Sequence, residues 1–305
     1  MKTINLGNGA LPASAISLGC MRMAGLDAKT AETVVKTALE EGIDFFDHAD
    51  IYGGGKSEEV FAKAIGMKAS VRARILLQSK CGIRQGFFDF SKEHILTSVD
   101  GILKRLKTDY LDVLLLHRPD TLVEPEEVAE AFSQLHHTGK VRHFGVSNQN
   151  PMQMALLQKY VTEKLIVNQL QLSITNTGMI DSGINVNMKI DRSLDRDGGI
   201  LEYCRLNEVT IQPWSPFQFG FFEGAFLDNP DFPDLNAKID EIAAKKGVNN
   251  TAITIAWLLR HPAKMQPIIG TMNPQRIRDI CKATEVEITR PEWYEIYRAA
   301  GNTLP

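Results

Sequence analysis

Short apolar runs alternate with amphipathic segments along most of the chain. Runs such as 43–46 and 112–116 are dominated by apolar residues, which is typical of strands buried on both faces of a parallel sheet. Between them, segments such as 92–106 repeat apolar residues every three or four positions, the spacing that gives a helix one buried face. The alternation predicts eight strands, each followed by a helix: 15–19, 43–46, 74–79, 112–116, 141–146, 166–170, 210–213 and 266–269.

Capping and turn residues mark where these elements begin and end. Ser91 provides a side-chain oxygen before the helix at 92–106, and Pro125 and Pro151 stand in first turns, where an N–H would have no helical partner. Gly7-Asn8-Gly9 separates two short extended runs and predicts an N-terminal β-hairpin. The other expected helices are 29–41, one that starts after Ser57, 125–138, 151–160, 199–206, 235–246, 251–260 and 290–300.

The order of the elements predicts the fold class. Eight strand–helix units in 305 residues indicate an α/β fold, a (β/α)8 TIM barrel, with the β-hairpin before it and extra helices at its C-terminus. Barrels of this length are commonly one domain and no linker divides the chain, so we expect residues 1–305 to form a single domain. Residues 173–198 interrupt the repeat with a long connection rich in Asn, Asp, Ser and Gly, which we expect to shape a pocket.

Composition and charge narrow the range of partners. The net charge of −3 and the pI of about 6.2 leave no basic footprint for nucleic acid. No apolar run approaches the roughly 20 residues of a membrane span, and the N-terminus lacks the apolar core of a secretion signal. Four scattered cysteines without metal-site spacing indicate reduced thiols and a cytoplasmic location. The absence of an exposed apolar stripe favours a monomer but leaves the oligomeric state open.

Three polar residues close successive apolar runs. Asp47, Lys80 and His117 lie 33 and 37 residues apart, about the length of one strand–helix unit, and Tyr52 follows the second strand closely. In a (β/α)8 barrel the C-terminal ends of the strands meet on the face where chemistry takes place. The spacing therefore predicts one active site that contains an aspartate, a tyrosine, a lysine and a histidine.

These four residue types suit the reduction of a carbonyl group. A tyrosine hydroxyl has a pKa near 10, and a lysine cation beside it favours the phenolate and lowers that pKa. Tyr52 would then be the general acid in reduction and the general base in oxidation. Lys80 would tune the phenol, Asp47 would hold Lys80, and His117 would orient the substrate. The alternatives are structural: a capping aspartate, a rim tyrosine, a solvated lysine and a buried core histidine.

Several motifs in order resemble the aldo-keto reductase family. The segments are Gly42 to Gly53, Leu115 to Asp120, Gly139 to Asn148, and Ile268 to Ile277, so the resemblance covers nearly the whole chain. It implies a TIM barrel and an NADPH-dependent oxidoreductase that reduces a small aldehyde or ketone to an alcohol, or oxidises the alcohol. It also assigns the catalytic roles to Tyr52, Asp47, Lys80 and His117, with Tyr52 as the proton donor.

The resemblance further implies where the cofactor binds. Phosphate would lie at Gly270, Thr271 and the helix that starts near Pro274, and the Arg276 guanidinium would face the adenosine 2′-phosphate. This arginine favours NADPH over NADH, although it does not rule NADH out. Asp279 would touch the adenine amine, and Trp214 would stack on the nicotinamide. The remaining cofactor-binding candidates are Gly19, Cys20, Met21, Ser147, Asn148, Gln169, Ser215 and Phe217.

Substrate recognition stays open at this point. Candidate rim residues are Met21, Arg22, Met23, Arg118, Phe217, Phe219, Phe221 and Phe222. Arg118 could attract an anionic substrate or pair with Asp120.

The pattern of residues also allows two other functions. Some barrels of this family are regulatory subunits that use a bound nicotinamide as a sensor. Metal-dependent hydrolase barrels place residues such as Asp47, His48, Asp50 and His117 at strand ends, but no later strand here ends in a histidine, so we expect no metal.

Overall fold

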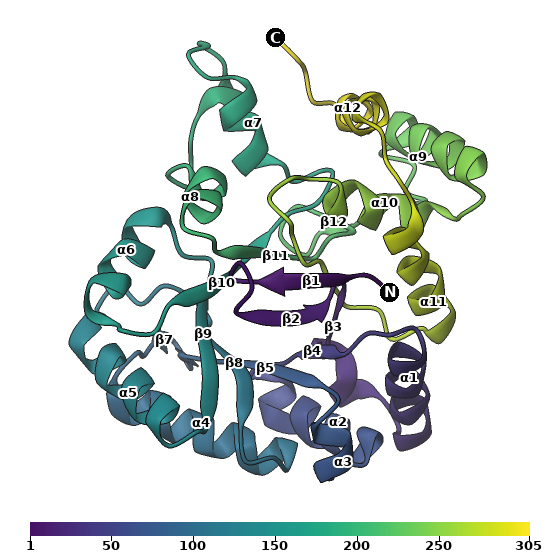
Figure 1. The fold of residues 1–305 in the computed structure, drawn as a ribbon. Coiled ribbons are helices and arrows are strands. Elements are labelled where there is room, and N and C mark those ends of the chain that lie inside the picture. The colour runs from purple at the N-terminus through teal and green to yellow at the C-terminus, as the bar shows by residue number, and fades with distance from the viewer.

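The computed structural model describes all 305 residues and contains one eight-stranded parallel sheet rolled into a nearly closed barrel (Figure 1). The order around the barrel is β11-β10-β9-β8-β5-β4-β3-β14, which confirms the predicted TIM barrel. Bounds are β3 (Ser17–Gly19), β4 (Phe45–Asp47), β5 (Leu76–Cys81), β8 (Leu111–Leu116), β9 (Val141–Ser147), β10 (Leu165–Gln171), β11 (Thr210–Trp214) and β14 (Ile268–Ile269).

The barrel closes between β11 and β14 without a regular ladder. The backbone N–H of Gln266, just before β14, donates to the Ile211 carbonyl at 3.0 Å. Alternate residues of a strand point the same way, so Pro213, two residues after Ile211, faces the same seam. Pro213 has no N–H with which to continue the ladder. The Gln212 and Gln266 side chains bridge the seam instead, with Nε2 to Oε1 at 2.8 Å.

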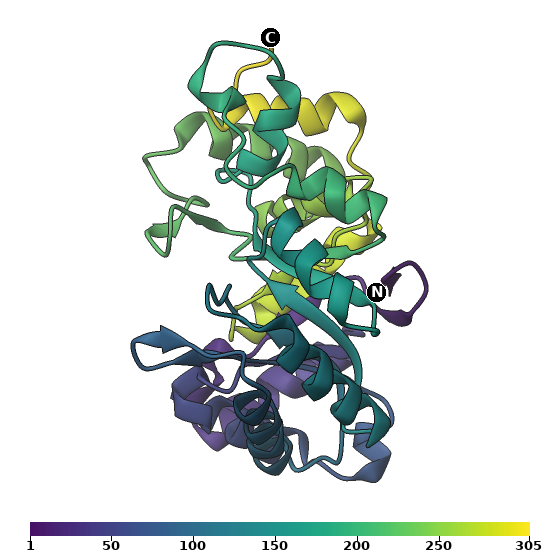
Figure 2. The ribbon, with the colours of Figure 1, turned by 90° about the vertical axis from the view of Figure 1, so that its left-hand side faces the viewer.

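A β-hairpin plugs the N-terminal end of the barrel, as the sequence predicts. It consists of antiparallel β1 (Thr3–Leu6) and β2 (Leu11–Ser14), drawn in purple in Figures 1 and 2. Leu6 and Leu11 pack against barrel residues that include Val113 and Leu115. Only the C-terminal end of the barrel is therefore open to a ligand.

Helices surround the sheet, and α4 shows why they form where they do. The Ser91 Oγ accepts the His94 N–H at 3.3 Å, and Ile95, Val99 and Ile102 share the buried face. Two short 3-10 helices, η1 and η2, follow β3 and β4. Bounds are α1 (Ala28–Glu40), α2 (Lys56–Ile65), α3 (Ala69–Arg72), α4 (Lys92–Leu106), α5 (Pro125–His137), α6 (Pro151–Tyr160), α8 (Ile200–Leu206), α9 (Pro233–Lys246), α10 (Asn250–Leu259), α11 (Pro274–Cys281), α12 (Arg290–Ala299), η1 (Met21–Gly25), η2 (Tyr52–Gly55) and η4 (Lys282–Glu285).

The connection at 173–198 differs from the prediction. It contains α7 (Gly178–Ile184) and η3 (Asp191–Ser193), and Figure 1 shows α7 near the C-terminus. The Tyr297 hydroxyl donates to Asp181 at 2.6 Å, and Arg192 pairs with the same carboxylate at 3.3 Å. The Tyr297 bond ties the segment to α12, and none of the residues of the segment lines the main cavity. The Ser173 hydroxyl does donate to the carbonyl of Gln218 at 2.7 Å, and Gln218 lines the cavity, so the segment supports the pocket wall without lining the pocket itself.

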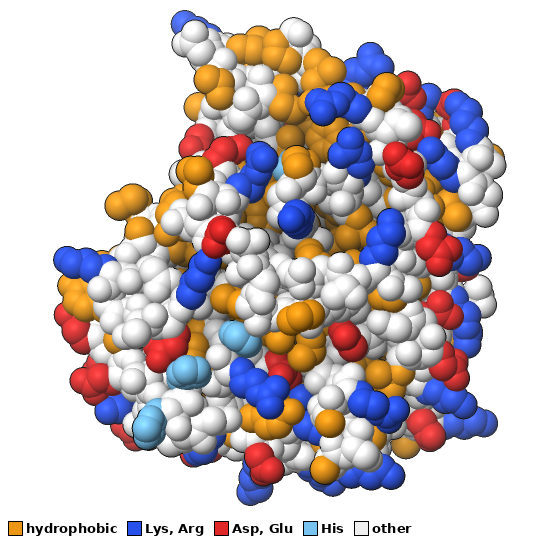
Figure 3. Space-filling view, viewed as in Figure 1, with side chains coloured by type: hydrophobic (Ala, Val, Ile, Leu, Met, Phe, Trp, Pro, Cys, Tyr) orange, Lys and Arg blue, Asp and Glu red, His pale blue; other side chains and the backbone are white.

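Two small hairpins at the mouth of the barrel were not predicted. They are β6 (Ile83–Arg84) with β7 (Phe87–Phe88), and β12 (Gln218–Phe219) with β13 (Gly224–Ala225). Figure 2 shows both on the side away from the N-terminal hairpin. On the face seen in Figure 3, acidic and basic side chains are interspersed. No helix combines the length and the apolar character that crossing a bilayer requires.

Candidate active site

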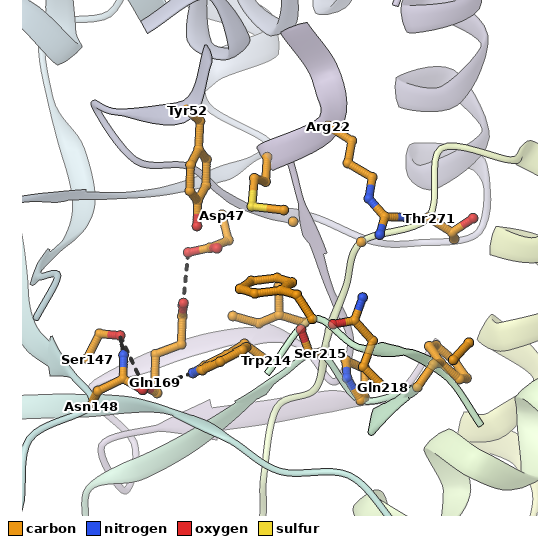
Figure 4. Close-up of a pocket in the computed structure, with 18 of the residues that line it drawn as sticks. Arg22, Asp47, Tyr52, Ser147, Asn148, Gln169, Trp214, Ser215, Gln218 and Thr271 are labelled. Carbon is orange, nitrogen blue, oxygen red and sulfur yellow. Dashed lines mark hydrogen bonds between the residues drawn. The ribbon is translucent and has the colours of Figure 1, made fainter. Parts of the chain in front are cut away.

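The C-terminal ends of three strands bring the predicted catalytic residues together. Asp47 is the last residue of β4, Lys80 lies near the end of β5, and His117 directly follows β8. Tyr52 begins the turn η2 beyond β4. Asp47, Tyr52 and His117 line a cavity of about 420 Å³ (Figure 4), whereas Lys80 is completely buried behind them.

Sheet register explains why Lys80 meets Asp47. Asp47 pairs with Gln78 across β4 and β5, and Gln78 and Lys80 point to the same face because they are two residues apart on one strand. The Lys80 Nζ donates to both Asp47 carboxylate oxygens at 2.7 and 2.8 Å, to the His48 carbonyl at 2.7 Å and to the Tyr52 hydroxyl at 3.2 Å. The ammonium group is thus fully coordinated, and one of its partners is a phenol that faces the cavity.

Burial and charge set the protonation of this cluster. Burial by itself would lower the pKa of Lys80, but attraction to Asp47 and Tyr52 outweighs it, so the pKa lies above its usual value and the amine stays charged. Burial raises the pKa of Tyr52, and the Lys80 cation offsets only part of that rise. Lys80 thus lowers the pKa of Tyr52, as the sequence predicts, but burial outweighs this effect, so the net shift is upward. Tyr52 keeps its proton at neutral pH.

His117 is neutral and lies beside the phenol. Burial, together with the Lys80 and Arg118 cations, holds the pKa of His117 well below its usual value. Its ring packs edge-on against Tyr52 with centroids 5.9 Å apart. The Nδ1 atom is buried without a partner, so Nε2 is the ring nitrogen available to a molecule in the cavity.

A chain of glutamine amides supports Asp47 from inside the barrel. Asp47 Oδ1 accepts from Gln78 Nε2 at 2.6 Å and from Gln169 Nε2 at 3.1 Å, and both amides also donate to Gln212 Oε1. Gln212 donates to Gln266, whose own amide donates to the Ser14 carbonyl at 2.8 Å near the N-terminal hairpin. Buried carboxylates need such partners.

Sequence reasoning missed Gln78, Gln212 and Gln266. The available signal was a single glutamine in or beside each of three runs predicted to be buried strands.

Ser147, Asn148 and Trp214 form a connected group on the opposite wall (Figure 4). Asn148 Nδ2 donates to Ser147 Oγ at 2.7 Å, and Trp214 Nε1 donates to Asn148 Oδ1 at 3.1 Å. Asn148 and Ser215 both have left-handed backbones, with φ of 57° and 52°. Such backbone strain in non-glycine residues tends to collect at functional sites.

The outer end of the cavity is lined by loops after β3 and β14. Gly19 and Gly270 line it, and at Gly19 a Cβ atom would lie 2.9 Å from Ile268, so only glycine allows β3 to approach β14. Asn273 caps α11 by accepting the Gln275 and Arg276 N–H groups. Of the predicted cofactor-binding residues, those that line the cavity are Gly19, Met21, Ser147, Asn148, Gln169, Trp214, Ser215, Phe217, Gly270, Thr271 and Arg276.

Two predicted cofactor-binding residues do not line the cavity. Cys20 is fully buried, and its Sγ lies 3.7 Å from the Leu18 carbonyl, so its side chain belongs to the core. Asp279 lies in the last turn of α11, where it accepts from Gln275 at 3.1 Å and lies 3.8 Å from Lys282. The structure therefore does not support their direct contact with a ligand in the cavity.

Some of the predicted rim residues line the cavity, and others do not. Met21, Arg22, Arg118, Phe217 and Phe222 line the cavity, whereas Met23 is wholly buried in the core.

The predicted alternative pairing of Arg118 with Asp120 is not formed. The Asp120 carboxylate accepts the backbone N–H groups of Phe90 and Leu122 instead, at 3.0 and 2.9 Å.

His48 and Asp50 lie outside the cavity. The His48 ring packs edge-on against Phe61, both of its nitrogens lack partners, and burial lowers its pKa to about 3. Burial raises the pKa of Asp50 to about 7, and the Glu58 carboxylate adds to that rise. No three His, Cys, Asp or Glu side chains come together as metal ligands would.

Comparison with known proteins identifies the family. Residues 15–300 match the Aldo/keto reductase family. The chain is 36% identical over 286 residues to the uncharacterized oxidoreductase YcsN of Bacillus subtilis, covering 90% of this chain and 89% of that protein. It is 34% identical over 305 residues to a 6-dehydroglucose reductase of Agrobacterium fabrum, covering 95% of each.

Solved structures agree with this assignment. The thermostable aldo-keto reductase Tm1743, crystallised with the inhibitor epalrestat, superposes with a TM-score of 0.79 at 26% identity, covering 98% of this chain and all of that one. An aldo/keto reductase of Klebsiella pneumoniae, crystallised with NADP and acetate, has the same fold, with a TM-score of 0.78 at 23% identity, covering 99% and 96%. The sequence match over nearly the whole chain, the relatives and the barrel together show that this protein belongs to the aldo-keto reductase family and is an NAD(P)H-dependent oxidoreductase.

Proposed function

We propose that the protein uses NADPH to reduce a small aldehyde or ketone to the alcohol, with Tyr52 as the proton donor. The observation that carries the proposal is the Lys80 ammonium, buried between the Asp47 carboxylate and the Tyr52 hydroxyl, 3.2 Å from the latter. This arrangement can stabilise the phenolate that remains after the proton leaves. The opposite wall of the cavity presents the flat indole of Trp214 and the side-chain amides of Asn148 and Gln169.

The residues of the cavity fit a nicotinamide dinucleotide. The Trp214 indole, held by Asn148, would stack on the nicotinamide, and Ser147, Asn148 and Gln169 would hold its carboxamide. At the outer end, Arg276 is exposed and makes no ion pair, and with Gly270 and Thr271 it suits the 2′-phosphate and pyrophosphate. The Klebsiella relative was crystallised with NADP, which also supports this choice of cofactor.

Each catalytic residue has one task in the reduction. Bound NADPH supplies the hydride, since no side chain can donate one. The neutral His117 and the Tyr52 hydroxyl hydrogen-bond to the carbonyl oxygen and fix the direction of the carbon that is attacked. Tyr52 would give its proton to the carbonyl oxygen as the carbon is reduced, which completes the alcohol. Lys80 stabilises the phenolate, and Asp47 keeps Lys80 charged and in place; oxidation of an alcohol reverses these steps.

The Tyr52→Phe variant tests this assignment. It keeps the ring and removes the proton, so we expect NADPH-dependent reduction of an activated aldehyde such as 4-nitrobenzaldehyde to fall by about 10³-fold or more. NADPH binding, followed by quenching of tryptophan fluorescence, should change little, and the surface variant Tyr160→Phe should keep full activity. Turnover at the wild-type rate in Tyr52→Phe would overturn the proposal. A protein that only senses nicotinamide would bind NADPH and reduce nothing.

A further inference from the structure

The cation beside His117 has no ion-pair or hydrogen-bond partner within the protein. Arg118 immediately follows His117 and lines the cavity. Its guanidinium lies 5.7 Å from the ring centroid of Trp214 and 5.9 Å from that of Phe221. These aromatic contacts hold the group in position, but they satisfy none of its N–H donors.

The other arginines with similar burial all contact a carboxylate. Arg118 is half-buried, yet it takes part in no ion pair, and Asp120, two residues away, is bonded to backbone N–H groups. A half-buried guanidinium without an acceptor loses hydration and gains no bond in exchange. The pairs made by the remaining buried or half-buried arginines are Arg72–Asp112, Arg105–Glu58, Arg192–Asp181 and Arg278–Glu41.

The acids that line the cavity do not pair with Arg118. Asp47 is bonded to Lys80, and Asp228 accepts from the Asn250 amide at 3.2 Å. The other cations that line the cavity are Arg22, in the turn η1 after β3, and Arg276, in α11. Arg118 is thus the cation next to His117, where the proposed function places the carbonyl group.

We propose that Arg118 binds a carboxylate of the substrate, so that the enzyme prefers aldehydes or ketones that also carry a carboxylate group. The inference rests on the proposed reductase function and extends it to a substrate class. The planar guanidinium can donate two parallel N–H bonds to a carboxylate, and the flanking Trp214 and Phe221 rings limit how far it can turn. The carboxylate of the substrate would then be held while His117 and Tyr52 contact the carbonyl oxygen.

A matched pair of substrates tests the proposal. 4-Carboxybenzaldehyde and its methyl ester differ in charge but carry the same aldehyde. In the wild type, kcat/KM for the acid should exceed that for the ester by about tenfold or more, as charged hydrogen bonds allow. Arg118→Met should remove this preference by raising KM for the acid, and should leave the ester within about twofold. Arg118→Lys keeps the charge but cannot donate two parallel N–H bonds, so its preference for the acid should lie between those of the wild type and Arg118→Met.

The controls separate this inference from the reductase assignment. Arg84→Met removes an arginine that pairs with Asp89 on the neighbouring hairpin and should keep the acid preference. Equal losses for acid and ester in Arg118→Met, or no loss, would overturn the inference while leaving the reductase function intact. If the wild type reduces neither aldehyde, the reductase proposal fails. Calorimetric binding of 4-carboxybenzyl alcohol and its methyl ester then decides for Arg118 alone: tighter binding of the acid, lost in Arg118→Met, supports the inference, and equal binding refutes it.

Discussion

Two buried ion pairs lie at opposite ends of the barrel and illustrate two uses of the same interaction. At the N-terminal end, Arg72 and Asp112 approach to 2.6 Å; at the C-terminal end, Lys80 and Asp47 approach to 2.7 Å. Each cation is nearly or completely buried. The pairs differ in where the other hydrogen bonds of the cation go.

The Arg72 guanidinium is satisfied entirely by structural groups. Besides Asp112, it donates to the Thr108 hydroxyl and to the Ile75 and Tyr110 carbonyls, and it stacks over the Tyr110 ring at 3.7 Å. Lys80 instead directs one bond to the Tyr52 hydroxyl, which faces a cavity. The first pair therefore fixes the end of the barrel, and the second connects a fixed charge to a group that can exchange a proton.

The largest expected effect comes from breaking the Lys80 pair. Lys80→Met removes the cation that stabilises the phenolate, so carbonyl reduction should fall by about 10²-fold or more. NADPH binding should change far less, because Lys80 does not line the cavity. Steady-state NADPH oxidation and fluorescence quenching measure the two effects. Lys140→Met, which removes a half-buried lysine paired with Asp100, is the matched control. Comparable activity in the two variants would refute the distinction between the pairs.

Breaking the Arg72 pair should have a smaller effect and act on stability. Arg72→Met leaves Asp112 buried with one charged partner fewer, so the free energy of unfolding should fall by about 3 kcal/mol. Urea denaturation measures this loss, and Arg74→Met, at an exposed neighbouring arginine, should change it by less than about 0.5 kcal/mol. The folded fraction of Arg72→Met should keep wild-type kcat. A specific loss of kcat without a loss of stability would contradict the structural role.

The sequence was sufficient for the barrel and for the gathering of the four candidate catalytic residues. Asp47, Lys80 and His117 were recognisable because a polar residue ends each apolar run, and parallel strands carry such ends to one face. The glutamine chain was not recognisable, because Gln78 and Gln212 meet across the barrel although they are 134 residues apart in the sequence. A lone glutamine in an apolar run does not identify its partner.

Other failures also have physical causes. Asp181 and Tyr297 are 116 residues apart, so nothing local showed that the 173–198 connection is tied to α12. Arg118 and Asp120 are neighbours, yet turn geometry gives Asp120 to backbone donors. For Tyr52 the sign of the pKa shift depends on how much of the phenol is buried, which only the three-dimensional packing determines.

The pH dependence of reduction tests most directly that Tyr52 is the proton donor. The pKa of Tyr52 is raised above its usual value near 10, and that of His117 is held well below its usual value. Tyr52 therefore keeps its proton and His117 stays neutral at and around neutral pH. For a substrate whose charge is constant, kcat/KM for carbonyl reduction should be flat between pH 6 and about 9. A decrease of about tenfold per pH unit across that range would identify a donor with a low pKa, such as protonated His117, and would contradict the account.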